Sequence, residues 1–134
     1  MLSVDLARRL LDTGLVWSPM PGDRFVVDRP GVGDDVFHLA DMTVEVHEFV
    51  GGSVIGFNGV TEWALDSVAL EETLWLPRED QLRELLGGTF LALRRDDGAY
   101  LVTTAVPLAG EEPAEHRAGT AADAYALALL ELVE

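Results

Sequence analysis

Two of the three histidines stand where strand geometry can bring imidazole and carboxylate groups together. Glu45 and His47 occupy alternate positions of one expected strand, and His38 belongs to the expected strand before it. Alternate residues of a strand point to the same face, so the three side chains can meet if the two strands are neighbours. Two imidazoles and a carboxylate suit a transition metal. A small metal-dependent hydrolase using His38, Glu45 and His47 is therefore one hypothesis for the function.

A second hypothesis starts from the aromatic residues of the same stretch. Phe49 continues the strand face of Glu45 and His47, and Trp63 and Trp75 follow it. Exposed aromatic side chains surrounded by carboxylates are typical of a protein-binding patch. The sequence therefore favours a non-enzymatic protein-binding or regulatory module, with Glu45, His47, Phe49, Trp63 and Trp75 as its binding residues.

The net charge of the chain indicates which charge a partner of such a module should carry. The chain has 134 residues, with 24 acidic and 9 basic side chains and a net charge of −15. Residues 41–80 hold nine carboxylates and one Arg, a net charge of −8, so more than half of the excess lies in the middle third. An acidic surface steers a basic partner toward it, besides keeping a protein in solution. We expect a basic protein partner, such as a toxin neutralised by an immunity-type protein.

Several function classes are excluded by missing residue types. All nine basic residues are Arg, and the chain has no Cys. Without Lys there is no Schiff-base chemistry and no phosphate-binding P-loop lysine. Without Cys there is no thiol nucleophile, disulfide or zinc–thiolate site. The negative charge argues against nucleic acid and against anionic membranes, and no apolar run approaches a membrane span. We therefore expect no cofactor, no nucleic acid, no membrane and a cytoplasmic location.

The elements that must position these residues follow from periodicity and turn chemistry. Apolar residues at helical spacing predict helices over 3–13, 77–86 and 120–133. Alternation and Gly-containing turns predict strands over 24–28 and 36–40, a hairpin over 42–57 and a second hairpin over 89–106 around Asp97-Gly98. Residues 109–119 are expected to form a surface loop, and residues 60–75 are compatible with helix or strand.

This order of elements suits an α+β fold. We expect one globular domain over residues 1–134, with a largely antiparallel β-sheet of about five to six strands. The N-terminal, central and C-terminal helices should pack on that sheet. The last helix is rich in Ala and Leu, which is typical of a buried structural helix and compatible with a homodimer interface.

Two stretches carry a resemblance to known proteins. They are Asp41-Met42-Thr43-Val44-Glu45-Val46-His47-Glu48-Phe49 with Ile55-Gly56-Phe57-Asn58-Gly59, and Leu74-Trp75-Leu76-Pro77-Arg78-Glu79-Asp80-Gln81-Leu82. The chain resembles, over most of its length, a group of uncharacterised small acidic proteins from actinobacteria, some of which are labelled pilus assembly protein of the CpaE type. The resemblance implies a compact family domain and supplies no catalytic residue.

Overall fold

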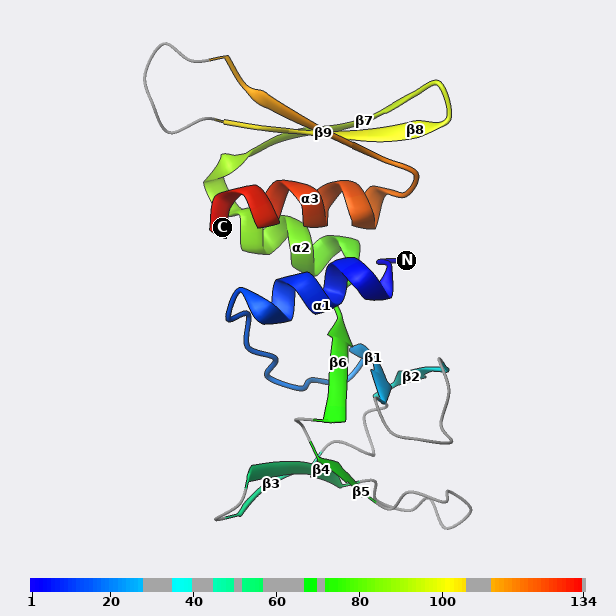
Figure 1. The fold of residues 1–134 in the computed structure, drawn as a ribbon, viewed down its shortest axis with the longest axis vertical. Coiled ribbons are helices and arrows are strands. Elements are labelled where there is room, and N and C mark those ends of the chain that lie inside the picture. Colours follow the sequence, from blue (N-terminus) through cyan, green and yellow to red (C-terminus); the bar gives the residue numbers. More distant parts are fainter. Residues whose placement is uncertain are drawn as a thin grey trace. The chain divides into compact units, whose positions relative to one another are not determined.

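Figure 1 shows the computed structural model of the chain. The structure describes residues 1–27, 35–39, 45–49, 52–56, 67–69, 72–105 and 112–133, with the backbone alone for the three segments between 45 and 69. These residues divide between two compact units: the helical unit, residues 1–15 and 77–134, and the central unit, residues 16–76. Helices and antiparallel strands confirm the α+β class, and the prediction of a single domain stays a prediction.

The helical unit contains a three-stranded antiparallel sheet of order β7-β8-β9, formed by β7 (Phe90–Asp96), β8 (Ala99–Thr104) and β9 (Ala114–Ala118). The turn between β7 and β8 is the expected Asp97-Gly98 pair, with φ of 49° and 76°. Both residues take the left-handed conformation that a two-residue hairpin turn of type I′ requires. The second hairpin predicted from the sequence is therefore confirmed.

One face of this sheet is covered by α3 (Ala121–Val133), which contacts β8 and β9. Val102 is fully buried on that face, and His116 lies directly across from it on β9. The Phe90 and Tyr125 rings pack with their centroids 5.7 Å apart. Burial raises the pKa of the Tyr125 hydroxyl, because the apolar surroundings disfavour the phenolate. Since these side chains share one face of the sheet, α3 and the sheet enclose a single core layer (Figure 1).

The opposite face of the sheet carries a lattice of charges. Arg94 on β7 pairs with Glu115 on β9 at 3.0 Å, and Arg117 on β9 pairs with Asp96 on β7 at 3.4 Å. Both pairs join the edge strands across the central strand, where Leu101 is only 6% exposed. The aliphatic stems of Arg94 and Arg117 flank Leu101 in register, so they shield it from water.

Two further helices pack against α3: α1 (Val4–Asp12) and α2 (Glu79–Leu86). Ser3 caps α1, because its hydroxyl accepts a hydrogen bond from the Leu6 N–H. The Ser3 N–H in turn donates to a carboxylate oxygen of Asp123 in the first turn of α3, at 2.7 Å. The N-terminal ends of α1 and α3 are thus adjacent, and the two helices run in the same direction.

The first turn of α2 is also fixed by polar contacts. The Arg78 N–H donates to the Gln81 side chain at 2.9 Å, which satisfies one N–H ahead of the helix. The Arg78 guanidinium donates to the Asp80 carboxylate at 3.1 Å and lowers the pKa of that carboxyl group. A short 3₁₀ helix, η2 (Gly87–Thr89), then leads from α2 into β7.

The central unit contains a sheet of order β2-β1-β6, formed by β1 (Arg24–Val27), β2 (Val36–His38) and β6 (Thr73–Leu76). Phe25 is fully buried and lies against the Trp17 and Phe37 rings, at centroid distances of 5.4 and 5.7 Å. Before β1, the buried Asp23 carboxylate accepts hydrogen bonds from the Trp17 indole N–H and the Met20 N–H. A buried charge with such donors anchors the loop over 17–22.

The other strands of the central unit form a sheet of order β3-β4-β5: β3 (Glu45–Phe49), β4 (Gly52–Gly56) and β5 (Ser67–Ala69). The antiparallel pairing of β3 with β4 confirms the first predicted hairpin. In residues 60–75, the described segments 67–69 and 73–76 are strands, which decides these parts against a helix.

Three predictions of detail are wrong. The structure has separate three-stranded sheets in place of one sheet of five to six strands. The main helix cover of the β7-β8-β9 sheet comes from α3, while α1 and α2 pack on α3. Residues Ala114–Ala118, expected in a loop, form β9, because their pairing with β8 and contact with α3 outweigh their small and polar composition.

Candidate functional site

The residues predicted to bind a partner are only partly brought together. Glu45, His47 and Phe49 occupy alternate positions of β3, where the backbone pairs them with Gly56, Val54 and Gly52. Trp75 lies in β6, which belongs to the other sheet of the central unit, and Trp63 lies outside the described residues.

Trp75 offers less of its surface than the binding hypothesis assumes. Its side chain is half-buried, and it lies across from Phe25 in the pairing of β6 with β1. Within the described residues, its buried indole N–H has no hydrogen-bond partner. The predicted surface of Glu45, His47, Phe49, Trp63 and Trp75 therefore stays a prediction.

The metal hypothesis required β2 and β3 to be neighbours. In the described pairing, β2 joins β1 while β3 joins β4, so His38 and the pair Glu45 and His47 belong to different sheets. This corrects the expectation of adjacent strands, which rested on chain order alone. No group of three or more His, Asp or Glu side chains suited to a metal ion occurs among the side chains that the structure describes. The ligand set His38, Glu45 and His47 stays a prediction.

A cluster that the sequence did not indicate surrounds His116 in the helical unit. The Thr104 hydroxyl lies 3.4 Å from His116 Nε2, and a Glu131 carboxylate oxygen lies 3.3 Å from His116 Nδ1. Hydroxyl, imidazole and carboxylate thus follow one another in the order of a catalytic triad. Thr104 is only 4% exposed, however, so a substrate has no approach to its hydroxyl. The cluster instead ties α3 to the β8–β9 face of the sheet.

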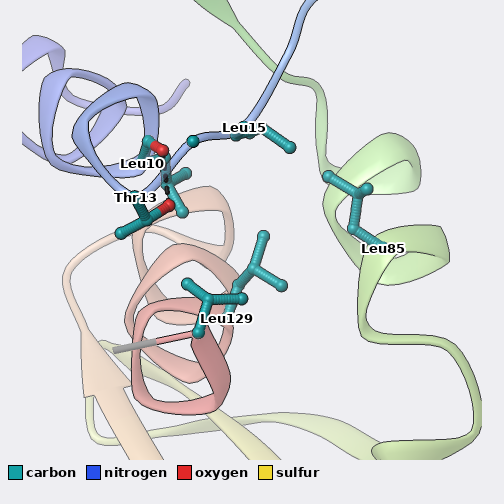
Figure 2. A pocket seen from close by; sticks show the side chains of 7 residues that line it. Leu10, Thr13, Leu15, Leu85 and Leu129 are labelled. Carbon is teal, nitrogen blue, oxygen red and sulfur yellow. Dashed lines mark hydrogen bonds between the residues drawn. The ribbon is translucent and has the colours of Figure 1, made fainter.

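A hollow in the helical unit lies among the ends of its three helices. We call it the helix-end hollow; it has a volume of ≈ 250 Å³ and is open on one side. It is lined by Leu10, Thr13, Gly14, Leu15, Leu85, Leu129 and Val133. Figure 2 shows side chains of α1, α2 and α3 pointing toward this space.

Local sequence explains why the helices end around the hollow. The Thr13 hydroxyl donates to the Leu10 carbonyl at 2.6 Å, and Gly14 follows in the left-handed conformation with φ of 100°, so α1 stops there. At the end of α2, Gly87 has φ of 57°, and the Thr89 hydroxyl donates to the Leu86 carbonyl. These polar groups close the helix backbones and leave aliphatic side chains to form the walls.

The mouth of the hollow is unusually apolar for a protein surface. Leu85 and Val133 line it and are 42% and 51% exposed, and their helices also expose Leu132 at 39%. On α1, Leu11 is 48% exposed beside the buried Leu10. Of these exposed side chains, Leu85 and Val133 line the hollow itself, whereas single exposed leucines elsewhere are ordinary on a protein surface.

The lining sets the chemistry that the hollow allows. None of its seven residues is titratable, and its one hydroxyl, that of Thr13, already donates to a backbone carbonyl. The hollow therefore offers apolar contact and shape, without a nucleophile, a general acid or base, or a metal ligand.

Sequence reasoning missed this site although each part had a signal. Leu10, Leu85 and Leu129 lie in segments correctly predicted to be helices, but periodicity assigns apolar residues to a core without showing where the core is left open. Leu85 is the informative residue, because it belongs to the apolar stripe expected for the 77–86 helix and is nonetheless 42% exposed.

Comparisons with known proteins add no family. No protein-family model matches the chain, and no significant match was found among curated proteins or solved structures. The resemblance to small acidic actinobacterial proteins therefore stays a prediction. None of the helices in the described residues combines the length and the apolar composition that crossing a membrane needs.

Proposed function

We propose that the chain is a non-enzymatic protein-binding module whose partner inserts an apolar side chain into the helix-end hollow. The observation that carries this proposal is the aliphatic hollow itself, whose lining includes Leu85 and Val133, 42% and 51% exposed. Fully burying an exposed aliphatic side chain contributes about 1.5–3 kcal/mol, and covering the exposed part of Leu85 or Val133 contributes a fraction of that. The binding surface proposed here is distinct from the acidic aromatic patch predicted from the sequence.

The size of the hollow favours a protein side chain over a small-molecule substrate. Small-molecule sites usually enclose roughly 300–1,000 Å³. The helix-end hollow has ≈ 250 Å³ and is open on one side. An apolar cavity of about 150 Å³ already accepts benzene, so this volume accommodates one aromatic or branched aliphatic side chain. A single side chain inserted into an apolar pocket is the usual anchor of a protein interface.

Site-specific photo-crosslinking tests the proposal. A photoreactive amino acid replaces Leu85 or Val133 in the full chain, which is then irradiated in the cells that produce it. Leu91 on β7 is the matched control, because it is 51% exposed and does not line the hollow. We expect positions 85 and 133 to crosslink the same protein, and position 91 not to do so.

A loss-of-function variant gives the second arm of the test. Leu85→Gln should lose the crosslinked protein when the probe is at position 133, whereas Leu91→Gln should retain it. Equal crosslinking from positions 85 and 91, or no crosslinking from the hollow, would contradict the proposal.

A further inference from the structure

We infer that the outer edge of β7 is a second docking site, where an extended segment of another protein adds to the β7-β8-β9 sheet as a further strand. The segment carries an apolar residue with an acidic residue two positions away on either side. This inference goes beyond the proposed function, because no residue of β7 lines the helix-end hollow. The juxtaposition behind it is an unpaired strand edge with an exposed leucine beside an arginine that lacks a carboxylate partner among the described residues.

Strand β7 is the least covered strand of its sheet. It pairs with β8 alone in the described structure, and every residue from Leu91 to Asp96 is exposed. Helix α3 lies over β8 and β9 and touches β7 where the Phe90 and Tyr125 rings meet. Leu93 is 37% exposed although it lies opposite Val102, which is fully buried. The apolar layer beneath α3 is therefore left open along β7.

The backbone of β7 decides what kind of segment fits. Asp96 and Ala99 flank the two-residue turn and form a hydrogen-bonded pair. Bonded and non-bonded pairs alternate along an antiparallel ladder, so Leu93 and Arg95 belong to non-bonded pairs. Their N–H and C=O groups point away from β8, and no backbone partner for these groups occurs in the described part of the chain. Donors and acceptors in this alternation match the backbone of another strand.

The side chain of Arg95 indicates the charge of the added strand. Its guanidinium lies 5.9 Å from the centre of the Tyr100 ring and has no carboxylate partner in the described structure, whereas Arg94 pairs with Glu115. Unlike charges directly opposite one another stabilise a pair of strands. An added strand therefore gains from Asp or Glu opposite Arg95 and from an apolar residue opposite Leu93.

A second arginine lies near the other end of the edge. Arg83 of α2 lies over the Phe90 ring, with its guanidinium 5.9 Å from the ring centre, and it also has no carboxylate partner among the described residues. Phe90 begins β7, so the two arginines stand on either side of Leu93 along the strand. A segment with an acidic residue on each side of an apolar one therefore matches the edge in either direction.

The same strand disfavours a second copy of the chain. A two-fold pair of β7 strands places Arg94 opposite Arg94, Arg95 opposite Arg95, or Arg95 opposite Leu91. The first two registers oppose like charges, and the third meets the irregular backbone around Leu91. Each copy also carries −15, which repels another copy, whereas a short acidic segment brings few charges.

Three synthetic peptides test the inference against the full chain. Each has a central valine, with a residue X two positions before and two positions after it and threonine elsewhere, and X is Glu, Gln or Lys. Affinity is measured by NMR titration at about 0.15 M salt, where screening beyond about 8 Å limits the effect of the net charge. We expect the Glu peptide to bind at least about threefold more tightly than the Gln peptide, and the Lys peptide to bind most weakly.

Hydrogen exchange locates the bound peptide on the edge. The Glu peptide should slow exchange at the Leu93 and Arg95 amides, which point outward. The Ala92 and Arg94 amides belong to the bonded pairs with β8 and should change little. Slowed exchange elsewhere on the chain, without protection of Leu93 and Arg95, would contradict the added strand.

Variants separate the charge from the backbone contact. Arg95→Gln should remove the difference between the Glu and Gln peptides, and Arg8→Gln on α1 is the charge-matched control that should retain it. Leu93→Pro removes an outward N–H, at a kind of position where edge strands tolerate proline, and should abolish binding. Leu93→Ala keeps this N–H and should weaken binding only severalfold. If the proline variant does not fold, amide exchange in the unmodified chain decides the same question.

The outcomes separate this inference from the proposed function. Leu85→Gln should leave all three peptides unchanged, and a protein crosslinked from position 91 alone leaves the proposed function standing. If the three peptides bind equally, the acidic partner is wrong, and if none slows exchange at Leu93 and Arg95 at about 1 mM, the docking edge is overturned. If analytical ultracentrifugation shows a dimer that Leu93→Pro abolishes, the occupant is a second copy and the inference is wrong.

Discussion

The two ends of the helix layer in the helical unit are built from opposite chemistry. At the N-terminal ends, Ser3 and Asp123 join α1 to α3 by a hydrogen bond of 2.7 Å, and Thr120 accepts a hydrogen bond from the Asp123 N–H. At the C-terminal ends, Leu85, Leu129 and Val133 line an open hollow. Polar contacts thus close one end, and apolar side chains are left uncovered at the other. The difference teaches that the same three helices can be joined by polar contacts at one end and leave apolar side chains uncovered at the other.

The floor of the hollow should matter most for stability. Leu10 is 1% exposed, so Leu10→Ala should lower the free energy of unfolding by about 2–5 kcal/mol, measured by urea denaturation. Its neighbour Leu11 is 48% exposed, and Leu11→Ala should cost no more than about 0.5 kcal/mol. If Leu10→Ala and Leu11→Ala lowered the free energy of unfolding equally, Leu10 would not be a buried residue at the base of the hollow.

Substitution at the N-terminal ends of α1 and α3 should cause the second-largest loss of stability. Asp123→Ala removes the acceptor for the Ser3 N–H and a carboxylate from the first turn of α3, and should lower the free energy of unfolding by about 1–2 kcal/mol. Asp123→Asn keeps an acceptor oxygen and should lose less. Hydrogen exchange should quicken at the Ser3 amide in the Ala variant, and unchanged protection there would argue against the bond.

The mouth of the hollow should hardly affect stability. Leu85→Gln should change the free energy of unfolding by no more than about 0.5 kcal/mol, because the side chain is 42% exposed. Leu82→Ala on the same helix is the contrast, since Leu82 is fully buried and its loss should cost about 2–5 kcal/mol. A large loss from Leu85→Gln would mean that Leu85 belongs to the core.

The smallest effect should come from Asp80, in the first turn of α2. The Arg78 guanidinium lowers the pKa of this carboxyl group in the folded protein. The pair therefore stabilises the fold above the unfolded-state pKa, and this contribution disappears as the pH falls through the lower folded-state pKa. Because the Asp80 side chain is 61% exposed, solvent screening keeps the contribution within about 0.5 kcal/mol.

A carboxyl titration followed by NMR measures the Asp80 pKa directly. In the wild-type chain the value should lie below that of an ordinary aspartate, and Arg78→Gln should raise it. Identical titrations in the two proteins would rule out the pair.

Sequence patterns predicted the parts of the fold that depend on neighbouring residues. The helix over 3–13 and the Asp97-Gly98 turn were expected, and both are decided within a few residues, the helix by the Ser3 cap and the Gly14 stop. The helix expected over 120–133 is likewise capped locally, because the Thr120 hydroxyl accepts a hydrogen bond from the Asp123 N–H. The Asp123 carboxylate, however, accepts a hydrogen bond from the N–H of Ser3, which is 120 residues away in the sequence. The fold brings these two atoms to 2.7 Å, and no local pattern predicts this contact.

The parts that were missed depend on distant segments. β9 has a weak strand pattern of its own, and only its pairing with β8 and its contact with α3 make it a strand. The helix-end hollow needs Leu10, Leu85 and Leu129 to converge from three helices, and no local pattern states that they leave space between them. Strand neighbours could not be read from chain order either, which is why His38 and His47 were expected in adjacent strands.

The charge lattice on the uncovered face of the β7-β8-β9 sheet also acts as a check on strand alignment. If β9 slid by one residue along β8, Arg117 and Glu115 would turn toward α3, and His116 would turn toward water. A one-residue misalignment of β9 would therefore bury charged side chains against α3, and this cost favours the observed alignment.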